Sequence, residues 1–489
     1  MVLSKKKISF SSTSLINYVF AFFPISFIFG NLFTNINIII FCVLGIFHLR
    51  SNILKIKLNF PIKIIFFLFL WIFFTTSLSF VKSLYFEGYD NDNLIRLIKS
   101  IAFFRYFLML IIIYLLNEYE VLNFKYFFVT AACSALLISL DIIYQYFFGF
   151  NIIGLKSQPS HNSSFFGEEL IAGGFILDFA FFSIFFLTCL LKNKNIYRYL
   201  LTTIAICILG AGILLSGNKM PLILFLFGVF LIFLFHNKLR KIIFLSLLSL
   251  FILFKFIISS NDELKGNYSS SYDNIVVGEV VPRISVLIPP SILSKFPLLK
   301  NYIEDVKKVN EEAFLQSEPI ETTETKDQNI PKVIYGKSAH KQLIFTAIDT
   351  WSGNKIFGNG LRSFRKDCRD DSNSKLSETT NLSENQRRCS THPHNYYIEI
   401  LTETGIVGIS LVLIIAIIFV IFIFKNFTFL KGDNLKNSLV LSGVISLFIE
   451  VFPIQTTGSI FTTNDTTYII LISSIILINK KLIIKENLQ

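Results

Sequence analysis

The sequence predicts an all-α membrane protein, a polytopic bundle of about twelve transmembrane helices with one large extracytoplasmic loop between the ninth and tenth spans. The first observation is composition. The 489 residues are 53% hydrophobic and 16% charged, with a mean hydropathy of +0.61, which is too apolar for a water-soluble globular protein. The second is the recurrence of apolar runs long enough to cross a hydrocarbon core of about 30 Å as helices. The third is an alternation of basic and neutral loops.

The apolar runs divide the chain into three parts. The first run follows a lysine cluster but has no small-residue cleavage site, so we read it as a helix and not as a signal peptide. The expected spans cover residues 14–34, 36–50, 62–81, 101–117, 124–147, 170–191, 198–216, 219–236, 241–258, 405–425, 436–453 and 466–483. These spans define an N-terminal bundle over 1–258, an extracytoplasmic loop domain over 259–395 and a C-terminal bundle over 396–489.

Basic residues set the expected topology. Lysine and arginine gather in alternate loops, near residues 5–7, 50–63, 192–198, 238–241, 425–436 and 480–485. The positive-inside rule makes these loops and both termini cytoplasmic, so the loop domain faces out. The net charge of +12 therefore reflects topology, and we expect the lipid bilayer and not nucleic acid as the partner of these residues.

The six cysteines fall into two groups. We expect four to be small buried hydrophobic residues within spans: Cys42, Cys133, Cys189 and Cys207. Cys368 and Cys389 lie in the large outer loop. An even pair on the oxidising side of a membrane, without a second pair at metal-ligand spacing, predicts a disulfide and not a metal site.

The loop domain contains two recognisable stretches. Its centre, "EEAFLQSEPIETTETKDQNIPK", has few aromatic residues and charges of both signs, which is typical of a solvated or poorly ordered segment. The following "GKSAHKQLIFTAIDTWSG" predicts an amphipathic helix that lies on the membrane or on the bundle. Its apolar face carries Leu343, Ile344, Ala347, Ile348 and Trp351. The sequence has no P-loop or dinucleotide-binding fingerprint.

The most specific motif begins at His394-Asn395 and continues, after nine residues, with Gly405-Ile406-Val407-Gly408. It resembles the H-[NSQ]-x9-G-x-x-G signature of the O-antigen ligase and O-antigen polymerase superfamily. The blocks "LDIIYQYFFGFNIIG", "FFGEELIAGGFI", "LSGNKMPLI" and "FGNGLRSFRKDC" resemble other parts of that family, so the resemblance covers roughly residues 100–425.

The resemblance implies a GT-C-like helical bundle in the bacterial inner membrane. It also implies glycosyl transfer on the periplasmic face, from an undecaprenyl-diphosphate-linked glycan to the hydroxyl of an acceptor. Family members need no nucleotide sugar, no metal and no other cofactor.

Such a transfer needs a base for the acceptor proton and cations for the departing diphosphate. His394 is the expected general base, because imidazole with a pKa of about 6.5 is available in its neutral form near neutral pH. The resemblance makes Asn395 a second catalytic residue, and Gly405 and Gly408 part of the substrate site. His392 lies on the same side as His394 if the chain is extended, so it is a candidate supporting partner.

The expected cations are Arg105, Lys219, Arg362 and Arg365. Arg105 lies within a span, where a charged side chain needs a polar cavity or partner unless it snorkels. Lys219 stands where ligases of the family usually have arginine, and it lacks the bidentate fork that suits phosphate. Arg362 and Arg365 flank glycines in "GNGLRSFR", where backbone amides and guanidinium groups can hold a diphosphate, although a solvated loop explains them equally well.

Acidic and aromatic residues complete the candidate site. Glu169, in "GEELIAGG", stands where the family has an acid. Glu168 and Asp141 either orient a histidine or arginine or are simply interfacial. Tyr396 and Tyr397 are candidates for lining a sugar site, and interfacial tyrosine is the alternative interpretation.

Several functions are compatible with these features of the sequence. A ligase would transfer the glycan to lipid A-core or another surface acceptor, and a polymerase would transfer it to a second lipid-linked glycan. A protein O-oligosaccharyltransferase is a third member of the same superfamily. A multi-span transporter is a more distant alternative, which predicts charged or broken helices at mid-membrane on several spans.

Overall fold

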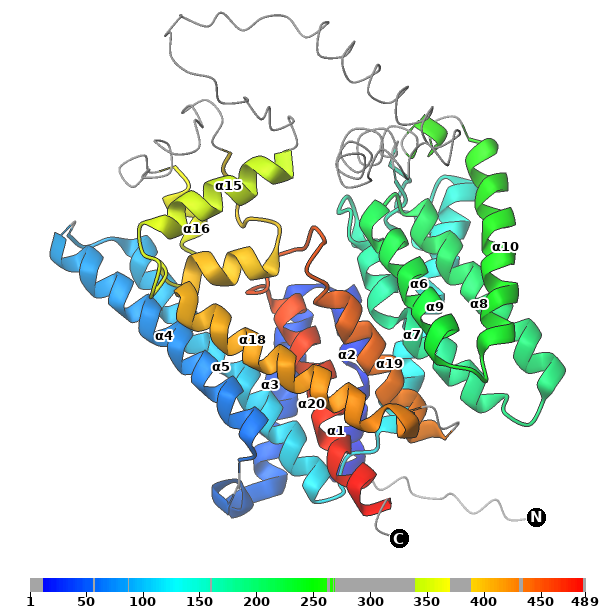
Figure 1. Ribbon diagram of the computed structural model, residues 1–489, viewed down its shortest axis with the longest axis horizontal. Helices are drawn as coiled ribbons and strands as arrows, with labels where there is room; N and C mark the ends of the chain where they lie inside the picture. The colour runs from blue at the N-terminus through cyan, green and yellow to red at the C-terminus, as the bar shows by residue number, and fades with distance from the viewer. Residues whose placement is uncertain are drawn as a thin grey trace, which may run out of the picture. The chain divides into compact units, whose positions relative to one another are not determined.

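The computed structural model describes residues 12–55, 58–86, 88–158, 161–261, 264–266, 268, 339–369, 388–430 and 434–486, and this part of the chain is helical (Figure 1). It contains no strand, only isolated β-bridges that join Phe150 to Lys156 and Gln158 to His161. The all-α prediction is therefore confirmed. The acidic stretch 311–332 and most of the expected loop domain lie outside the described residues. The chain divides into two compact units, 1–250 with 337–489, and 251–336.

The helices follow the apolar runs of the sequence. Their bounds are α1 (Ser12–Ala21), α2 (Phe23–Ile28), α3 (Asn31–Leu49), α4 (Phe60–Phe86), α5 (Asn91–Glu118), α6 (Phe124–Phe148), α7 (Ala172–Leu190), α8 (Asn195–Leu215), α9 (Lys219–Phe235), α10 (Arg240–Ser259), α15 (Ala339–Ser352), α16 (Phe364–Asp367), α18 (Tyr396–Leu430), α19 (Leu435–Glu450) and α20 (Thr463–Glu486). Short 3-10 helices lie at Arg50–Lys55 and Ser164–Phe166.

Within the described residues, 8 helices are long and apolar enough to cross a membrane, and two shorter apolar helices accompany them. The long ones are α3 to α8, α10 and α18. The shorter ones cover Lys219–Phe235 and Thr463–Leu477. The chain is thus a membrane protein with several spanning helices.

The expected single span over 14–34 is wrong. The chain forms α1 and α2 there, and α3 begins at Asn31. Pro24 occupies the first turn of α2, where its ring and its missing N–H prevent α1 from continuing. Gly30 then has a φ of +86°, a conformation that glycine adopts without steric cost. Hydropathy does not register either feature, because both residues lie inside one apolar run.

Two helices begin about half of a membrane span earlier than the apolar runs indicate. α5 begins at Asn91, and the Asp90 carboxylate caps it by accepting a hydrogen bond of 3.0 Å from the Asp92 N–H. α18 begins at Tyr396, and the expected start of its span, Gly405, is a kink inside the helix with φ +67°. The N-terminal segments of both helices mix charged and polar residues with apolar ones, which hides them from a hydropathy window. His394 and Asn395 of the motif therefore directly precede α18, and Gly405 and Gly408 lie within it.

α18 collects the elements that build the site. It packs on α4, α15, α16 and α19 (Figure 1). Leu343 and Ala347 of α15, Phe364 of α16 and Cys368 form a small buried core against Ile398 of α18. The predicted amphipathic helix is thus α15, and its apolar face covers the start of α18.

Candidate functional site

Three imidazoles meet just before α18. The ring of His394 has its centroid 4.2 Å from that of His392 and 5.4 Å from that of His340, which lies in the first turn of α15. Thr457, in the loop between α19 and α20, donates its N–H to the His394 carbonyl oxygen at 3.0 Å. The Thr457 hydroxyl is buried and has no hydrogen-bond partner within the described residues, which leaves it available to a bound group.

His394 is held in an unusual backbone conformation. Its φ is +56°, and Arg362 has a φ of +57°. Few non-glycine residues adopt this left-handed region, and the cost of about 1–3 kcal/mol persists where the surrounding structure enforces it. Two of the residues that the sequence singled out for chemistry thus share a strained backbone, which is a common property of functional sites.

His392 has both ring nitrogens engaged. Nε2 lies 3.3 Å from the Thr457 carbonyl oxygen, and Nδ1 lies 3.0 Å from the Thr391 hydroxyl. A carbonyl only accepts, so Nε2 carries the hydrogen and Nδ1 accepts from Thr391. Burial, together with the neighbouring His394, lowers the pKa of His392 to about 4. This geometry fits the supporting role and leaves His392 no free nitrogen for a substrate proton.

His394 is the imidazole with the better geometry for a base. Partial burial lowers the pKa of the His394 ring, and the nearby His340 lowers it further. An interaction of the ring with the Thr457 backbone raises the pKa and so acts in the opposite direction. The neutral form, which has one lone pair free to accept a proton, therefore prevails near neutral pH.

Asn395 uses both ends of its amide on the backbone. Its oxygen accepts from the N–H groups of Tyr397 and Ile398 at 3.1 and 3.2 Å, and its nitrogen donates to the Pro453 carbonyl oxygen at 3.0 Å. These bonds cap α18 and fasten the α19–α20 loop to it. The geometry gives Asn395 a positioning role, and its expected catalytic role stays a prediction.

Arg362 lies in the loop before α16 and faces the start of α18. Its backbone N–H donates to Glu403 Oε2 at 2.6 Å, and its Nη2 donates to the Phe461 carbonyl oxygen at 3.1 Å. Burial is the main cause that lowers the pKa of Arg362, and the neighbouring Arg365 lowers it further. Glu403, Tyr106 and Glu399 favour the charged form. Since arginine titrates far above neutral pH, the guanidinium stays charged.

Arg96, which no sequence motif singled out, fixes this loop. Its Nε donates to the Leu361 carbonyl oxygen at 2.9 Å and its Nη2 to that of Asn359 at 2.6 Å. Thr76 accepts from the Leu361 N–H at 2.9 Å, and the Glu403 carbonyl oxygen accepts from Gly360. The sequence signal for Arg96 was its position beside an apolar run, because an ionisable side chain there needs a buried polar partner.

Glu399 and Glu403 are buried on one face of α18, four residues apart. The Glu399 carboxylate accepts from the Ser459 hydroxyl at 2.5 Å and from the Ile460 N–H at 2.9 Å. The pair therefore binds the α19–α20 loop and the Arg362 loop to the same helix. The spacing of two acids in "IEILTETG" was the signal that sequence reasoning missed.

The remaining expected cations occupy different places. Arg105 stacks on Tyr106, with its guanidinium carbon 4.1 Å from the ring centroid, and its Nε donates to Asn35 at 3.1 Å. Tyr106 also acts electrostatically on Arg362, so the structure brings both arginines to one tyrosine. Arg365 is exposed and lies within electrostatic reach of Arg362 and His392.

Lys219 is the first residue of α9, at its junction with α7. The preceding Asn218 accepts from the Gly173 N–H at 3.0 Å and donates to the Leu170 carbonyl oxygen at 2.8 Å. These bonds anchor the turn of Lys219 to α7, whereas the histidines are anchored to the α19–α20 loop. A role for Lys219 in holding substrate stays a prediction.

The expected acids lie near the start of α7. Glu169 is exposed, and its N–H donates to Phe166. Glu168 accepts through its carbonyl oxygen from His161 at 3.4 Å. Asp141 is buried and accepts from the Ile152 N–H at 3.0 Å and the Ser164 hydroxyl at 2.5 Å. Asp141 thus organises the loop after α6, and no bond of the described residues assigns Glu169 to the histidines.

The two motif glycines allow close packing. A Cβ on Gly405 would collide with the Ile356 carbonyl, and one on Gly408 would collide with Thr404. The break at Gly405 also frees the Thr404 carbonyl oxygen, which accepts from Trp71 Nε1 at 2.8 Å. These contacts explain both glycines by packing, and their contact with substrate stays a prediction.

Cys368 and Cys389 are bonded through their sulfurs, with Cα atoms 5.5 Å apart. Cys368 belongs to the small core of α15, α16 and α18, and Cys389 lies three residues before His392. The bond therefore ties the segment of the histidines to a packed core.

We expect this disulfide in the native protein, where closing its loop should stabilise the fold by roughly 3 kcal/mol on the chain-entropy account. Peptide mapping without reduction should recover the 368–389 pair, and Cys389→Ser should lower the unfolding temperature. Both thiols reacting with an alkylating agent before reduction would contradict this expectation. Cys133→Ser, which removes an exposed thiol, is the matched control.

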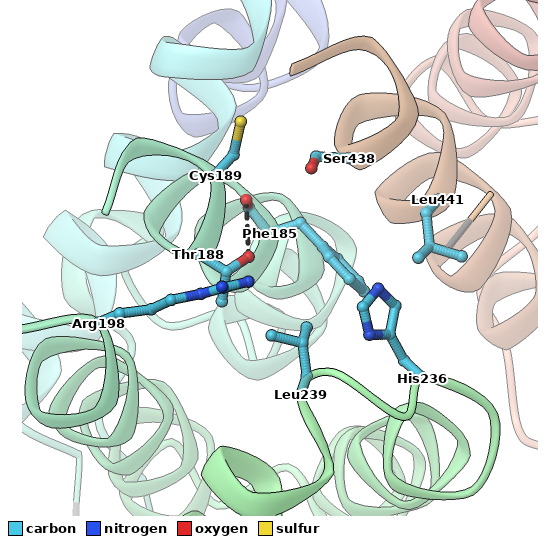
Figure 2. A pocket seen from close by; sticks show the side chains of 8 residues that line it. All are labelled: Phe185, Thr188, Cys189, Arg198, His236, Leu239, Ser438 and Leu441. Atoms are coloured by element: carbon cyan, nitrogen blue, oxygen red, sulfur yellow. Dashed lines mark hydrogen bonds between the residues drawn. The ribbon is translucent and has the colours of Figure 1, made fainter. Parts of the chain in front are cut away.

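A small pocket lies apart from these residues, at the ends of α7 and α9 and the starts of α8, α10 and α19 (Figure 2). It is lined by Phe185, Thr188, Cys189, Arg198, His236, Leu239, Ser438 and Leu441. None of the residues expected for chemistry lines it.

The fold and the site define a class of protein, a polytopic helical membrane protein with histidines and arginines gathered at the end of a spanning helix. The protein family described as O-antigen ligase matches residues 204–413, a range that includes His394, Arg362 and the motif glycines. The match confirms that the resemblance is to the O-antigen ligase and polymerase superfamily. No curated protein matches the chain.

Proposed function

We propose that the protein is an O-antigen ligase-like glycosyltransferase that moves a glycan from an undecaprenyl-diphosphate carrier to a surface acceptor such as lipid A-core. The observation that carries this proposal is His394, a neutral imidazole fixed at the start of α18 inside the family-matched range. We place the protein in the bacterial inner membrane with both termini cytoplasmic and the histidines on the periplasmic face, as the distribution of basic loops indicates.

The proposed step has a simple balance. The acceptor hydroxyl gives its proton to His394 while its oxygen forms a bond to the anomeric carbon of the glycan. The bond from that carbon to the diphosphate breaks, and its electron pair leaves with the diphosphate. Arg362 and Arg365 stabilise the departing anion, because guanidinium groups bind phosphate oxygens through two parallel hydrogen bonds.

The polymerase and the protein O-oligosaccharyltransferase use the same donor chemistry, so they are the nearest alternatives. The transporter has less support. Its broken helices would expose backbone groups to a cargo, whereas the break in α18 is closed by Trp71, which binds the Thr404 carbonyl, and by Lys355, whose carbonyl oxygen accepts from Ile406 at 2.9 Å.

Deletion of the gene and electrophoresis of surface glycolipids test the proposal. Free lipid A-core together with an intact lipid-linked polymer supports the ligase. Core that carries a single repeat supports the polymerase, and unchanged glycolipids with unglycosylated surface protein support the oligosaccharyltransferase. Unchanged glycolipids and glycoproteins would contradict all three.

Substitutions should show which cationic side chains hold the diphosphate. We expect Arg362→Ala to abolish transfer without loss of membrane insertion, and Arg362→Lys to recover only part, because lysine lacks the fork. If Lys219 also holds phosphate, Lys219→Ala should be inactive and Lys219→Arg as active as the wild type or more so. The measurement is glycan transfer at matched protein level, with Lys192→Ala in an exposed basic loop as control. Full transfer by Arg362→Ala would rule out its role.

A further inference from the structure

The role of His394 as a base leaves one requirement open, the removal of the proton before the next turnover. An imidazolium that retained its proton could not accept a second one, and it would repel the arginines that hold the diphosphate. The half-buried position of His394 restricts direct exchange with bulk water. A neighbouring group that can carry a proton would therefore speed its release.

The three imidazoles differ in exposure and in the hydrogen bonds that they make. His392 and His394 are half-buried, and His340 is exposed. His392 is a poor recipient, because its Nε2 already donates to Thr457 and its Nδ1 accepts from Thr391. Burial and the neighbouring His394 also disfavour its charged form most strongly, with a pKa of about 4.

His340 is the better recipient. Its ring meets that of His394 edge to face, with centroids 5.4 Å apart and an interplanar angle of 85°. Its position is fixed by α15, which packs on α18 through Leu343 and Ala347. A charge on His340 disfavours a charge on His394, so the pair carries one proton more readily than two. Transfer across this contact moves the proton from a half-buried ring to an exposed one.

We propose that His340 is the proton exit of the site. It takes the proton from the His394 imidazolium, directly or through one water molecule, and releases it to the solvent buffer. No bond other than N–H and O–H changes in this step, and the solvent base is the final acceptor. The inference rests on the proposed function, because it presupposes that His394 accepts the proton of the acceptor hydroxyl.

The test compares steady-state transfer by purified full-length variants in lipid vesicles at low and high buffer concentration. We expect His340→Gln to lower kcat about tenfold at low buffer with little change in KM, since one proton-transfer step typically contributes 10² to 10⁴ and water replaces it partly. Added imidazole should restore the rate. The wild type and His161→Ala, which removes a histidine of another loop, should not respond to buffer.

The outcomes separate the two proposals. Wild-type kcat of His340→Gln at low buffer, or a loss that neither buffer nor imidazole restores, overturns the proton-exit role. His340→Ala provides a second variant, and the unfolding temperature of both shows whether α15 stays packed. A fully active His394→Ala would instead overturn the base on which the inference rests, whatever His340→Gln does.

Discussion

His394→Ala is expected to insert normally and to lose nearly all glycan transfer. Removal of a general base typically costs about 10² to 10⁴ in rate, and the ring of His394 is the imidazole of the half-buried pair without two fixed hydrogen-bond partners. The assay is complementation with matched protein levels, scored as long-chain glycan attached to the acceptor. His392→Ala should be milder, because His392 only supports its neighbour through Thr457, whose carbonyl oxygen accepts from His392 and whose N–H donates to the His394 carbonyl oxygen.

The pH dependence provides an independent check of the same assignment. Burial lowers the pKa of His394 below that of free imidazole, so the base stays neutral as pH falls through about 6.5. The acid limb of kcat/KM should therefore lie below that of an ordinary histidine. An acid limb centred at or above 6.5, or wild-type transfer by His394→Ala, would assign the proton to another group.

His392 adds a stability term with a definite sign. Its pKa is about 4 in the folded protein and about 6.5 in an unfolded chain. Below 6.5 the unfolded state therefore binds the proton first. The contribution to the free energy of unfolding is complete above about 6.5 and falls as pH decreases toward 4. His392→Gln should flatten this part of the profile.

Gly405→Ala is expected to abolish transfer by disrupting the start of α18. Its φ of +67° is costly for alanine, by about 1–3 kcal/mol. Its Cβ would also collide with the Ile356 carbonyl and lie 2.7 Å from the Gly358 nitrogen, and both are backbone atoms that cannot rotate away. The Arg362 loop and the His394 segment both depend on this packing, so we expect a lower unfolding temperature together with lost activity.

Gly174→Ala is the matched control. Gly174 lies in α7, and a Cβ there meets no atom within 4 Å, so we expect unchanged transfer and equal or slightly higher stability. Gly405→Ala with an unchanged unfolding temperature and a raised KM for the donor would instead support the substrate-binding role that the motif implies. Wild-type stability and transfer together would exclude both roles.

The sequence by itself determined the class of protein, the positions of most spanning helices and the resemblance to the O-antigen ligase and polymerase superfamily. These properties depend on local quantities, namely hydropathy over a helix length and the spacing of His394, Gly405 and Gly408, which a linear reading records. It did not place the break at Pro24 and Gly30, nor the starts of α5 and α18, because hydropathy averaged over a helix length does not register a single proline or glycine and excludes N-terminal segments that mix polar with apolar residues.

Only the tertiary structure decided which residues meet. Arg96, Glu399 and Glu403 hold loops that are up to 265 residues away in sequence, and such pairing depends on buried hydrogen bonds that must be satisfied wherever the fold brings donors and acceptors together. His340 joined His394 for the same reason. It lies more than 50 residues earlier, on a helix whose apolar face packs on α18, and no periodicity in the sequence relates the two rings.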